Sequence, residues 1–200
     1  VGDVELFAQT ISAYEKKPQV IAITGSNGKS TVTAMCGDMC KAAGRDTVMA
    51  GNFGLPVLDV LDEIDGGRNV PEVVVLELSS FQLETTDTFR PWISALLNFS
   101  PDHLDRHRDE ASYAAAKQRI FANQRPDDWA VVNADSAEAL AMTSHVRARV
   151  VSYGLDHTEA DVHVGNGFVW QRTSEGDIPL LRSEEHTSEL QSRQYLVCRL

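Results

Sequence analysis

One short stretch of the chain combines residue types that can bind a phosphate group. The apolar run Val20–Ile23 leads into the sequence TGSNGKST at positions 24–31, where two glycines precede a lysine and two hydroxyl residues. Glycines permit backbone angles at which successive N–H groups point at one anion. A helix that begins here adds the positive end of its dipole. The residues predicted to hold a nucleotide are Gly25, Ser26, Asn27, Gly28, Lys29, Ser30 and Thr31.

Lys29 and Ser30 occupy the positions at which P-loop nucleotide enzymes have a phosphate-binding lysine and a Mg²⁺-binding hydroxyl residue. In those enzymes the lysine contacts the β- and γ-phosphates, and the hydroxyl that follows it holds Mg²⁺. The general form G-x-x-x-x-G-K-[ST] requires a glycine where this chain has Ile23. An ordinary strand–turn–helix corner with glycines is the alternative, but the correct placement of both residues after Gly28 favours nucleotide binding.

Glu77 is a carboxylate inside the otherwise apolar run Val73–Leu78. A buried carboxylate without a partner is costly, so the run demands a compensating group. A Mg²⁺ ion near the loop's phosphates would supply it, because hard cations bind carboxylate oxygens. A salt bridge or an exposed position at a sheet edge is the alternative.

A polar cluster at 98–107 follows the next apolar run, and it contains His103 and His107. Their spacing is compatible with a zinc pair, but the proline turn and the absence of an H-E-x-x-H pattern argue against one. His103 is a candidate for facing phosphate or Mg²⁺. We expect His107 to be a surface or capping residue.

Two further residues have less distinctive patterns. Asn52 follows a predicted strand, and the glycines on either side of it would let a ligand approach the backbone closely. Lys117, in a helical stretch, looks on pattern alone like an ordinary solvated lysine.

The elements that would position these residues alternate along the chain. Strands are predicted at 20–24, 47–50, 72–78, 92–98, 129–132 and 150–153, and helices at 29–43, 55–64, 109–123 and 136–144. This alternation predicts an α/β fold of three layers, with a mostly parallel sheet covered on both faces. Ligands bind beyond the carboxyl ends of such strands, which is where the candidate residues stand. Short segments at 160–164 and 167–171 predict a small β hairpin at the C-terminal edge.

Composition limits the classes of function. The 200 residues suit one domain, and 42% hydrophobic residues can form a core. The net charge of −11 argues against a nucleic-acid partner, because no basic face is available to release counterions. No apolar run is long enough for a membrane span. Cys36, Cys40 and Cys198 form neither a C-x-x-C pair nor a disulfide framework, so we expect a cytoplasmic protein with reduced cysteines.

Several separate motifs, in this order and at this spacing, resemble the ATP-binding central domain of the Mur ligases. They are TGSNGKST at 24–31, GNFGLP at 51–56, LELSSFQLE at 76–84, the segment 97–105 and AAK at 115–117. The family's loop has the form T-G-x-N-G-K-[ST], which accounts for Ile23. The segments GDVELF at 2–7, 51–56 and 76–84 are most similar to the member that joins D-glutamate to UDP-N-acetylmuramoyl-L-alanine.

The resemblance implies an ATP- and Mg²⁺-dependent ligase of cytoplasmic peptidoglycan synthesis, a pathway that serves cell-wall growth, cell shape and division. The γ-phosphate would pass to the alanyl carboxylate of the UDP-linked substrate, and the amine of D-glutamate would displace phosphate from the acyl phosphate. It implies no nucleic-acid or membrane partner, and a monomer at full length.

The resemblance also implies roles for individual residues. The implied catalytic residues are Lys29, Lys117 and His103. The implied ligands of two Mg²⁺ ions are Ser30, Glu77, His103 and a carbamylated Lys117, of which His103 and Lys117 would join Glu77 at the second ion. The residues implied to face the muramoyl-alanine substrate are Asn52, Ser79 and Gln82. The role of Lys117 as a metal ligand comes from the resemblance alone. It replaces the interpretation of Lys117 as an ordinary solvated lysine, which its local pattern favours.

The resemblance covers about residues 1–182. We expect 1–17 to be a linker from an N-terminal UDP-binding domain, 18–182 to be the central domain, and 183–200 to be a non-native tail that resembles translated sequencing adapter. The family's S-G-x-H-N run is absent, so we expect a fragment that does not catalyse ligation alone. The alternatives are another Mur ligase or a folylpolyglutamate synthetase-like ligase, a P-loop module without ligase activity, and a structural domain without nucleotide.

Overall fold

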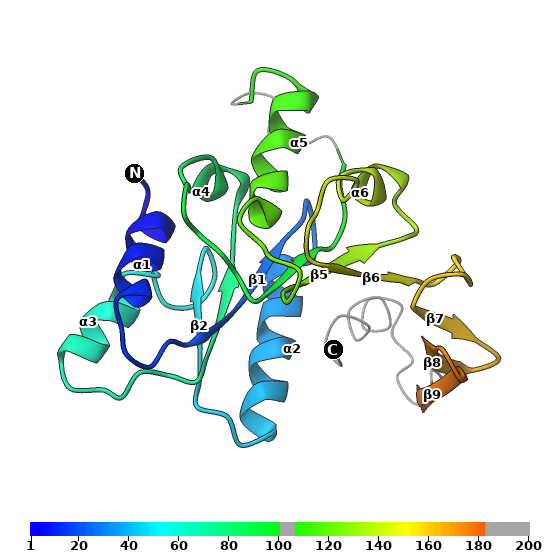
Figure 1. Ribbon diagram of the computed structural model, residues 1–200, viewed down its shortest axis with the longest axis horizontal. Coiled ribbons are helices and arrows are strands. Elements are labelled where there is room, and N and C mark those ends of the chain that lie inside the picture. Colours follow the sequence, from blue (N-terminus) through cyan, green and yellow to red (C-terminus); the bar gives the residue numbers. More distant parts are fainter. Residues whose placement is uncertain (101–106, 183–200) are drawn as a thin grey trace.

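A computed structural model describes residues 1–100 and 107–182 of the chain (Figure 1). His103 and the predicted non-native tail at 183–200 lie outside the described residues. Figure 1 shows strands running side by side through the middle of the molecule, with helices around them.

The strands of the described part form one nine-stranded sheet in the order β2-β3-β1-β4-β5-β6-β7-β8-β9. Their bounds are β1 Gln19–Thr24, β2 Thr47–Gly51, β3 Val73–Glu77, β4 Ile93–Leu96, β5 Trp129–Asn133, β6 Arg149–Gly154, β7 Val162–Gly165, β8 Phe168–Thr173 and β9 Gly176–Arg182. All pairs from β2 to β7 are parallel, and β8 and β9 are antiparallel additions. The predicted α/β fold with a mostly parallel sheet is confirmed.

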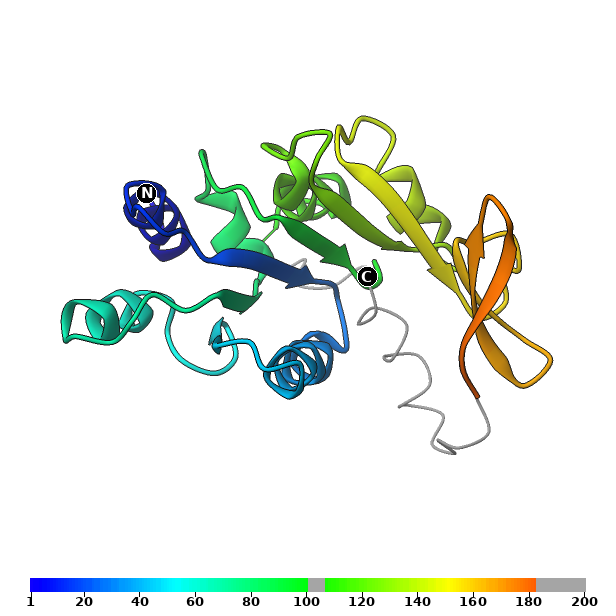
Figure 2. The same cartoon turned by 60° about the horizontal axis from the view of Figure 1, so that its bottom comes forward.

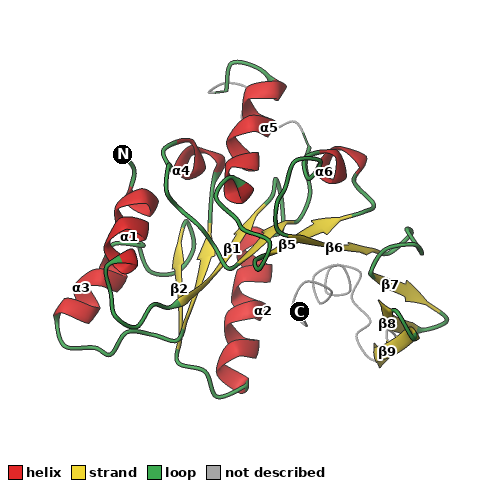
Figure 3. Ribbon diagram, in the orientation of Figure 1, coloured by secondary structure: helices red, strands yellow, loops and turns green. Residues whose placement is uncertain are grey.

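Helices lie on both faces of this sheet (Figures 2 and 3). They are α1 Asp3–Ser12, α2 Lys29–Ala42, α3 Asp59–Asp65, α4 Ser80–Glu84, α5 Glu110–Gln118 and α6 Ala137–Ala141, with a short 3₁₀ turn, η1, at Arg119–Phe121. One apolar cluster joins α1, α3, α4, η1 and α6 to the sheet, and a second joins α2 and the β7–β9 strands to its other face. No helix in the described part of the chain has both the length and the apolar character needed to cross a membrane.

The C-terminal edge differs from the sequence expectation in one respect. The predicted hairpin is present as β7 and β8, but a third strand, β9, extends it. Most residues of β9 are exposed and it contains Pro179, so it lacks the apolar alternation that would predict a strand. The five-residue helix α4 was also not predicted, because it is too short to show a helical period.

The order of the strands determines where a ligand can bind. β1 lies between β3 and β4, and the chain leaves β1 through α2 on one face. The chain leaves β4 toward α5, which lies on the opposite face (Figure 2). In open α/β sheets, a ligand crevice forms where neighbouring strands send their connections to opposite faces. The crevice in this fold therefore lies at the carboxyl ends of β1 and β4.

Helix α1 falls within the segment predicted to be a linker, and it packs firmly on the domain. Val4 and Phe7 are fully buried in the core. Between them, the Glu5 carboxylate accepts hydrogen bonds from the N–H groups of Asp87 (2.7 Å) and Thr88 (2.9 Å) and from the Thr88 hydroxyl (2.6 Å). Glu5 thereby connects α1 to the turn that leads into β4.

The pKa of Glu5 reflects this connection. Burial acts to raise the pKa, but the donors from Asp87, Thr88 and Gln9 outweigh it and lower the pKa from its ordinary value of 4.5 to about 2. The folded state therefore binds this proton less tightly than the unfolded chain does. The resulting stabilisation is complete above the unfolded pKa and is lost as the pH falls from 4.5 toward 2.

We expect Glu5→Gln to lower the free energy of unfolding by about 2 kcal/mol at pH 7, because the amide loses the charge-assisted bonds. The deficit should shrink as the pH approaches 3. Urea unfolding of both proteins across this range measures it. Glu15→Gln is the matched control, because Glu15 is exposed just beyond α1, and it should unfold like the unchanged protein at every pH. An equal deficit for Glu5→Gln at pH 7 and pH 3 would contradict the assignment.

Candidate functional site

The predicted phosphate-binding loop connects β1 to α2, as its sequence indicates. Gly28 is the N-cap of α2 and has a φ of 80°, a left-handed conformation that strains any residue with a side chain. The Lys29 ammonium turns back over the loop and donates to the carbonyl oxygens of Gly25 and Ser26, both at 3.0 Å. Ser30 lies exposed in the first turn of α2. The loop has the form that an anion site at a helix N-terminus requires.

Asn98, which follows β4, holds this loop from the neighbouring strand. Its Oδ1 accepts from the N–H groups of Ser26 and Asn27, both at 2.9 Å, and its Nδ2 donates to the Asn27 carbonyl at 3.0 Å. The Ser26 hydroxyl donates to the Ser100 carbonyl and accepts from the Ser100 N–H, also at 3.0 Å. The Ser26 side chain is therefore engaged with the segment after β4. The sequence analysis places Asn98 in the polar cluster that follows this strand but assigns it no individual role.

Helix α5 brings Lys117 to the same loop. Its ammonium donates to the Gly25 carbonyl at 2.9 Å, so this one oxygen accepts from both Lys29 and Lys117. Lys117 is only 2% exposed, and its nitrogen lies 4.7 Å from the centre of the Tyr113 ring. The pattern-based reading of Lys117 as a solvated helix lysine is therefore wrong. α5 directs it inward because this face of the helix packs on the loop.

Glu77 and Asn52 meet at the carboxyl ends of β3 and β2. Glu77 is 1% exposed, and its Oε1 accepts from Asn52 Nδ2 at 2.7 Å. Gly51 makes this approach possible, since a Cβ there would lie 2.3 Å from the Glu77 carbonyl oxygen. The other carboxylate oxygen, Oε2, is buried and has no hydrogen-bond partner among the described residues.

The Oε2 atom of Glu77, unpartnered among the described residues, is a suitable ligand for a Mg²⁺ ion. A buried carboxylate oxygen without a donor is a high-energy arrangement that a hard cation would relieve. Ser30, at the start of α2, is the hydroxyl that the loop places for the same ion. Among the described residues, no three His, Cys, Asp or Glu side chains gather as a metal site would require. These residues therefore suit a Mg²⁺ ion that is bound by a few protein groups together with the phosphates of a ligand, which is the usual arrangement for Mg²⁺.

Ser79 and Gln82, predicted to face a substrate, form the capping box of α4. The Ser79 side chain accepts from the Gln82 N–H at 3.2 Å, and the Ser79 N–H donates to Gln82 Oε1 at 3.2 Å. Gln82 Nε2 donates to Asp3 Oδ2 of α1 at 3.1 Å. Both residues therefore lie just beyond β3 at the ligand edge, where they hold α4 and α1 together.

His107 is buried, so the expectation of a surface or capping residue is wrong. It is 3% exposed, and its Nε2 lies 2.9 Å from the Ser80 hydroxyl while its Nδ1 lies 3.2 Å from a Glu84 oxygen. Its ring stacks on Phe81 at 5.2 Å between centres. His107 is buried because it packs on α4, which supplies these three contacts and which the sequence pattern does not predict, and on Tyr113 of α5, whose ring centre lies 5.0 Å away.

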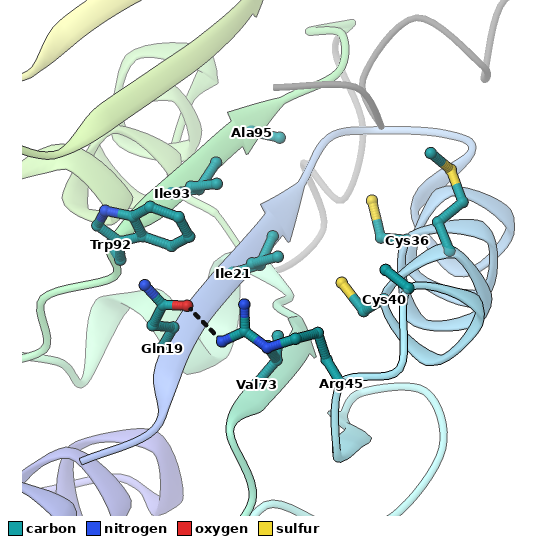
Figure 4. A pocket seen from close by; sticks show the side chains of 11 residues that line it. Gln19, Ile21, Cys36, Cys40, Arg45, Val73, Trp92, Ile93 and Ala95 are labelled. Atoms are coloured by element: carbon teal, nitrogen blue, oxygen red, sulfur yellow. Dashed lines mark hydrogen bonds between the residues drawn. The ribbon is translucent and has the colours of Figure 1, made fainter. Parts of the chain in front are cut away.

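A separate hollow of about 330 Å³ lies on the α2 face of the sheet (Figure 4). Figure 4 shows Cys36 and Cys40 of α2 directed into it opposite Ile21, Ile93 and Trp92. Cys36 is buried and Cys40 is partly buried, whereas Cys198 lies outside the described residues. None of the predicted site residues lines this hollow, so it is distinct from the loop.

The chain is similar in sequence and in fold to known proteins. A family profile described as the Mur ligase middle domain matches residues 23–193. The chain is 53% identical over 176 residues to UDP-N-acetylmuramoylalanine–D-glutamate ligase of Thiobacillus denitrificans, covering 82% of this chain and 36% of that protein. It is 50% identical over 150 residues to the enzyme of the same name from Caulobacter vibrioides, covering 74% of this chain and 31% of that protein. The chain thus spans about a third of the length of these relatives.

A solved structure of UDP-N-acetylmuramoyl-L-alanyl-D-glutamate–2,6-diaminopimelate ligase has a similar fold. The TM-score is 0.67 at 21% identity, and the match covers 98% of this chain and 50% of that one. At this identity the similarity establishes the fold, which agrees with the sheet described above.

The orphaned oxygen of Glu77 generates a prediction about Mg²⁺. Without Mg²⁺, Glu77→Gln is expected to melt at the same temperature as the unchanged protein or higher, because a costly buried charge is removed. With Mg²⁺ and ATP the order should reverse, and the Mg²⁺ affinity of the variant should be about tenfold lower or weaker still. Thermal unfolding and calorimetric titration with Mg²⁺ measure both effects.

Glu72→Gln is the matched control for this prediction. Glu72 immediately precedes the other end of the same strand, where it forms a partly exposed ion pair with Arg45. This variant should keep the full response to Mg²⁺. Equal Mg²⁺ affinity in the Glu77→Gln variant and the unchanged protein would exclude Glu77 from the metal site.

Proposed function

The chain belongs to the Mur ligase family, and on that premise we propose that it is the ATP-binding part of an amide ligase that joins D-glutamate to UDP-N-acetylmuramoyl-L-alanine. The observation that carries the proposal is that Lys29 and the buried Lys117 both donate to the Gly25 carbonyl, while the buried Glu77 lies on the adjacent strand in register with Ile23, just before the loop. The choice of D-glutamate is supported by the names of the relatives at 50–53% identity.

The proposed reaction has two steps. An oxygen of the alanyl carboxylate attacks the γ-phosphorus of ATP, and the bond from that phosphorus to ADP breaks, which leaves an acyl phosphate. The amine of D-glutamate then attacks the acyl carbon, inorganic phosphate leaves, and the amine loses a proton as the amide forms. Two anions must meet in the first step, so the site's main task is to neutralise and align them.

The chain's own residues suit that task. Lys29 would leave the carbonyls of Gly25 and Ser26 and place its charge on the β- and γ-phosphates, while the first N–H groups of α2 bind the same oxygens. Bound Mg²⁺ would supply further neutralisation of phosphate charge. We propose that Ser30 and Glu77 hold two Mg²⁺ ions, with His103 and a carbamylated Lys117 joining Glu77 at the second ion.

The acceptor would lie beyond β2 and β3. Asn52 is exposed at the end of β2, and Ser79 and Gln82 follow β3, so all three stand at the edge that the loop faces. We propose that they contact the muramoyl-alanine substrate. Binding would require Asn52 or Gln82 to exchange its present partner, Glu77 or Asp3, for a substrate group.

A direct test uses the full-length protein that carries this sequence. We expect release of inorganic phosphate that depends on ATP, UDP-N-acetylmuramoyl-L-alanine and D-glutamate together. Lys29→Ala should lower kcat/KM by at least about 10²-fold, because it removes a charge aimed at the transferring phosphate. Lys41→Ala, an exposed lysine at the other end of α2, should have no effect. A preference for another amino acid over D-glutamate would assign the chain to a different ligase specificity.

The proposed carbamate on Lys117 has its own test. Lys117→Ala should lose at least about 10²-fold in kcat, and short carboxylic acids such as acetate or propionate should restore part of it, because they supply the missing carboxylate. The Lys29→Ala variant provides the contrast, since a carboxylic acid cannot replace its cation and no recovery is expected. Absence of recovery in Lys117→Ala would reject the carbamate role.

A further inference from the structure

We propose that Asn98 is a positioning residue that fixes the shape of the phosphate-binding loop and so selects which backbone N–H groups meet the phosphates. In this assignment the N–H groups of Ser26 and Asn27 are structural, and those from Gly28 to Thr31 bind phosphate. The inference rests on the proposed nucleotide binding and extends it to a residue outside the loop motif.

The Asn98 amide uses both of its ends on the loop. Its oxygen accepts from two consecutive N–H groups, of Ser26 and Asn27, and its nitrogen donates to the Asn27 carbonyl. The Ser26 N–H also lies 3.2 Å from the backbone carbonyl of Asn98. The Asn98 side chain thus bonds to the loop backbone as a neighbouring strand would, because it offers the loop both an acceptor and a donor. Neither a shorter nor an acidic side chain offers this combination.

This pairing determines which donors remain for a ligand. A backbone N–H is a single donor, so the groups of Ser26 and Asn27 are directed at Asn98 and away from a phosphate. The first intrahelical bond of α2 runs from the Val32 N–H to the Gly28 carbonyl, at 3.1 Å. The N–H groups of Lys29, Ser30 and Thr31 precede that bond and have no acceptor within the helix. They form the open end of the helix toward which Lys29 can swing.

Asn98 is itself held in place from the far side. The buried Tyr153 of β6 donates its hydroxyl to the carbonyl of Leu97, at 3.0 Å, which fixes the strand end immediately before Asn98. The Tyr113 hydroxyl of α5 lies 3.3 Å from the Ser26 hydroxyl on the other side of the loop. The loop is therefore shaped before ligand arrives, so that binding does not have to order it.

The test compares Asn98→Ala with the unchanged full-length protein, using Mg²⁺ with ATP and Mg²⁺ with inorganic tripolyphosphate as probes. Loss of the pairing frees two loop residues that binding must then order, so we expect both affinities to fall by about tenfold or more. The KM values for the UDP-linked substrate and D-glutamate should stay within about twofold, because the proposed acceptor contacts follow β2 and β3, whereas Asn98 follows β4. An equal loss for ATP and tripolyphosphate places the effect at the phosphates.

Asn133→Ala is the matched control. Asn133 also ends a neighbouring parallel strand, and its side chain accepts from the Asp135 N–H at 2.9 Å, so its loss disturbs the same sheet edge without releasing the phosphate loop. This variant should bind both probes normally. Tyr153→Phe, which frees the Leu97 carbonyl but keeps the ring, should weaken both probes in the same direction by about two- to fivefold, and it decides the question if Asn98→Ala does not fold.

The outcomes separate the inference from the function on which it rests. If the unchanged protein binds Mg²⁺–ATP and the folded Asn98→Ala variant binds it equally well, the positioning role is overturned and the proposed function stands. If binding of tripolyphosphate is unchanged while that of ATP falls, the role at the phosphates is also overturned. If the unchanged protein binds neither probe, both the inference and the proposed function fail.

Discussion

The carbonyl oxygen of Gly25 is the point on which the candidate site depends. It accepts from Lys29 at the start of α2 and from Lys117 on α5, helices that lie on opposite faces of the sheet. Asn98 fixes the next two residues of the same loop. A loop of glycines would otherwise pay a large entropy cost on binding a ligand. These hydrogen bonds order the loop when the protein folds, so ligand binding does not have to order it.

The site also contains groups that would destabilise an ordinary core. Glu77 keeps one carboxylate oxygen without a donor among the described residues, and Lys117 is almost completely buried. Glu5 shows the contrast, since its buried carboxylate is well supplied with donors and its pKa falls to about 2. Glu5, which connects α1 to the domain, therefore has a full set of hydrogen-bond donors. Glu77, at the ligand edge of the sheet, lacks a donor for one oxygen among the described residues. Such an imbalance is expected where a cation or substrate completes the arrangement.

Local patterns anticipated the fold and the loop because both depend on short-range chemistry. Alternating apolar strands and helices predicted the parallel sheet, and the apolar run around Glu77 predicted its burial. The same reasoning failed for α4, whose five residues are held by a capping box and by packing. Because the sequence pattern does not predict α4, it favours a surface or capping role for His107, which instead is buried against α4 and Tyr113 of α5. Strand β9 was not predicted either, because most of its residues are exposed and do not show the alternation of apolar and polar residues that indicates a strand.

The order of residues along the chain was sufficient to identify a glycine-rich loop, its lysine and the strand and helix that flank it, because those groups are neighbours in sequence. The partners of that loop depend on tertiary structure. Asn98 lies 72 residues from Ser26, and Lys117 lies 92 residues from Gly25. Contacts at such separations depend on β4 pairing with β1 and on α5 packing beside the loop. No local pattern encodes that assembly, because sheet order is decided by the burial of many side chains at once.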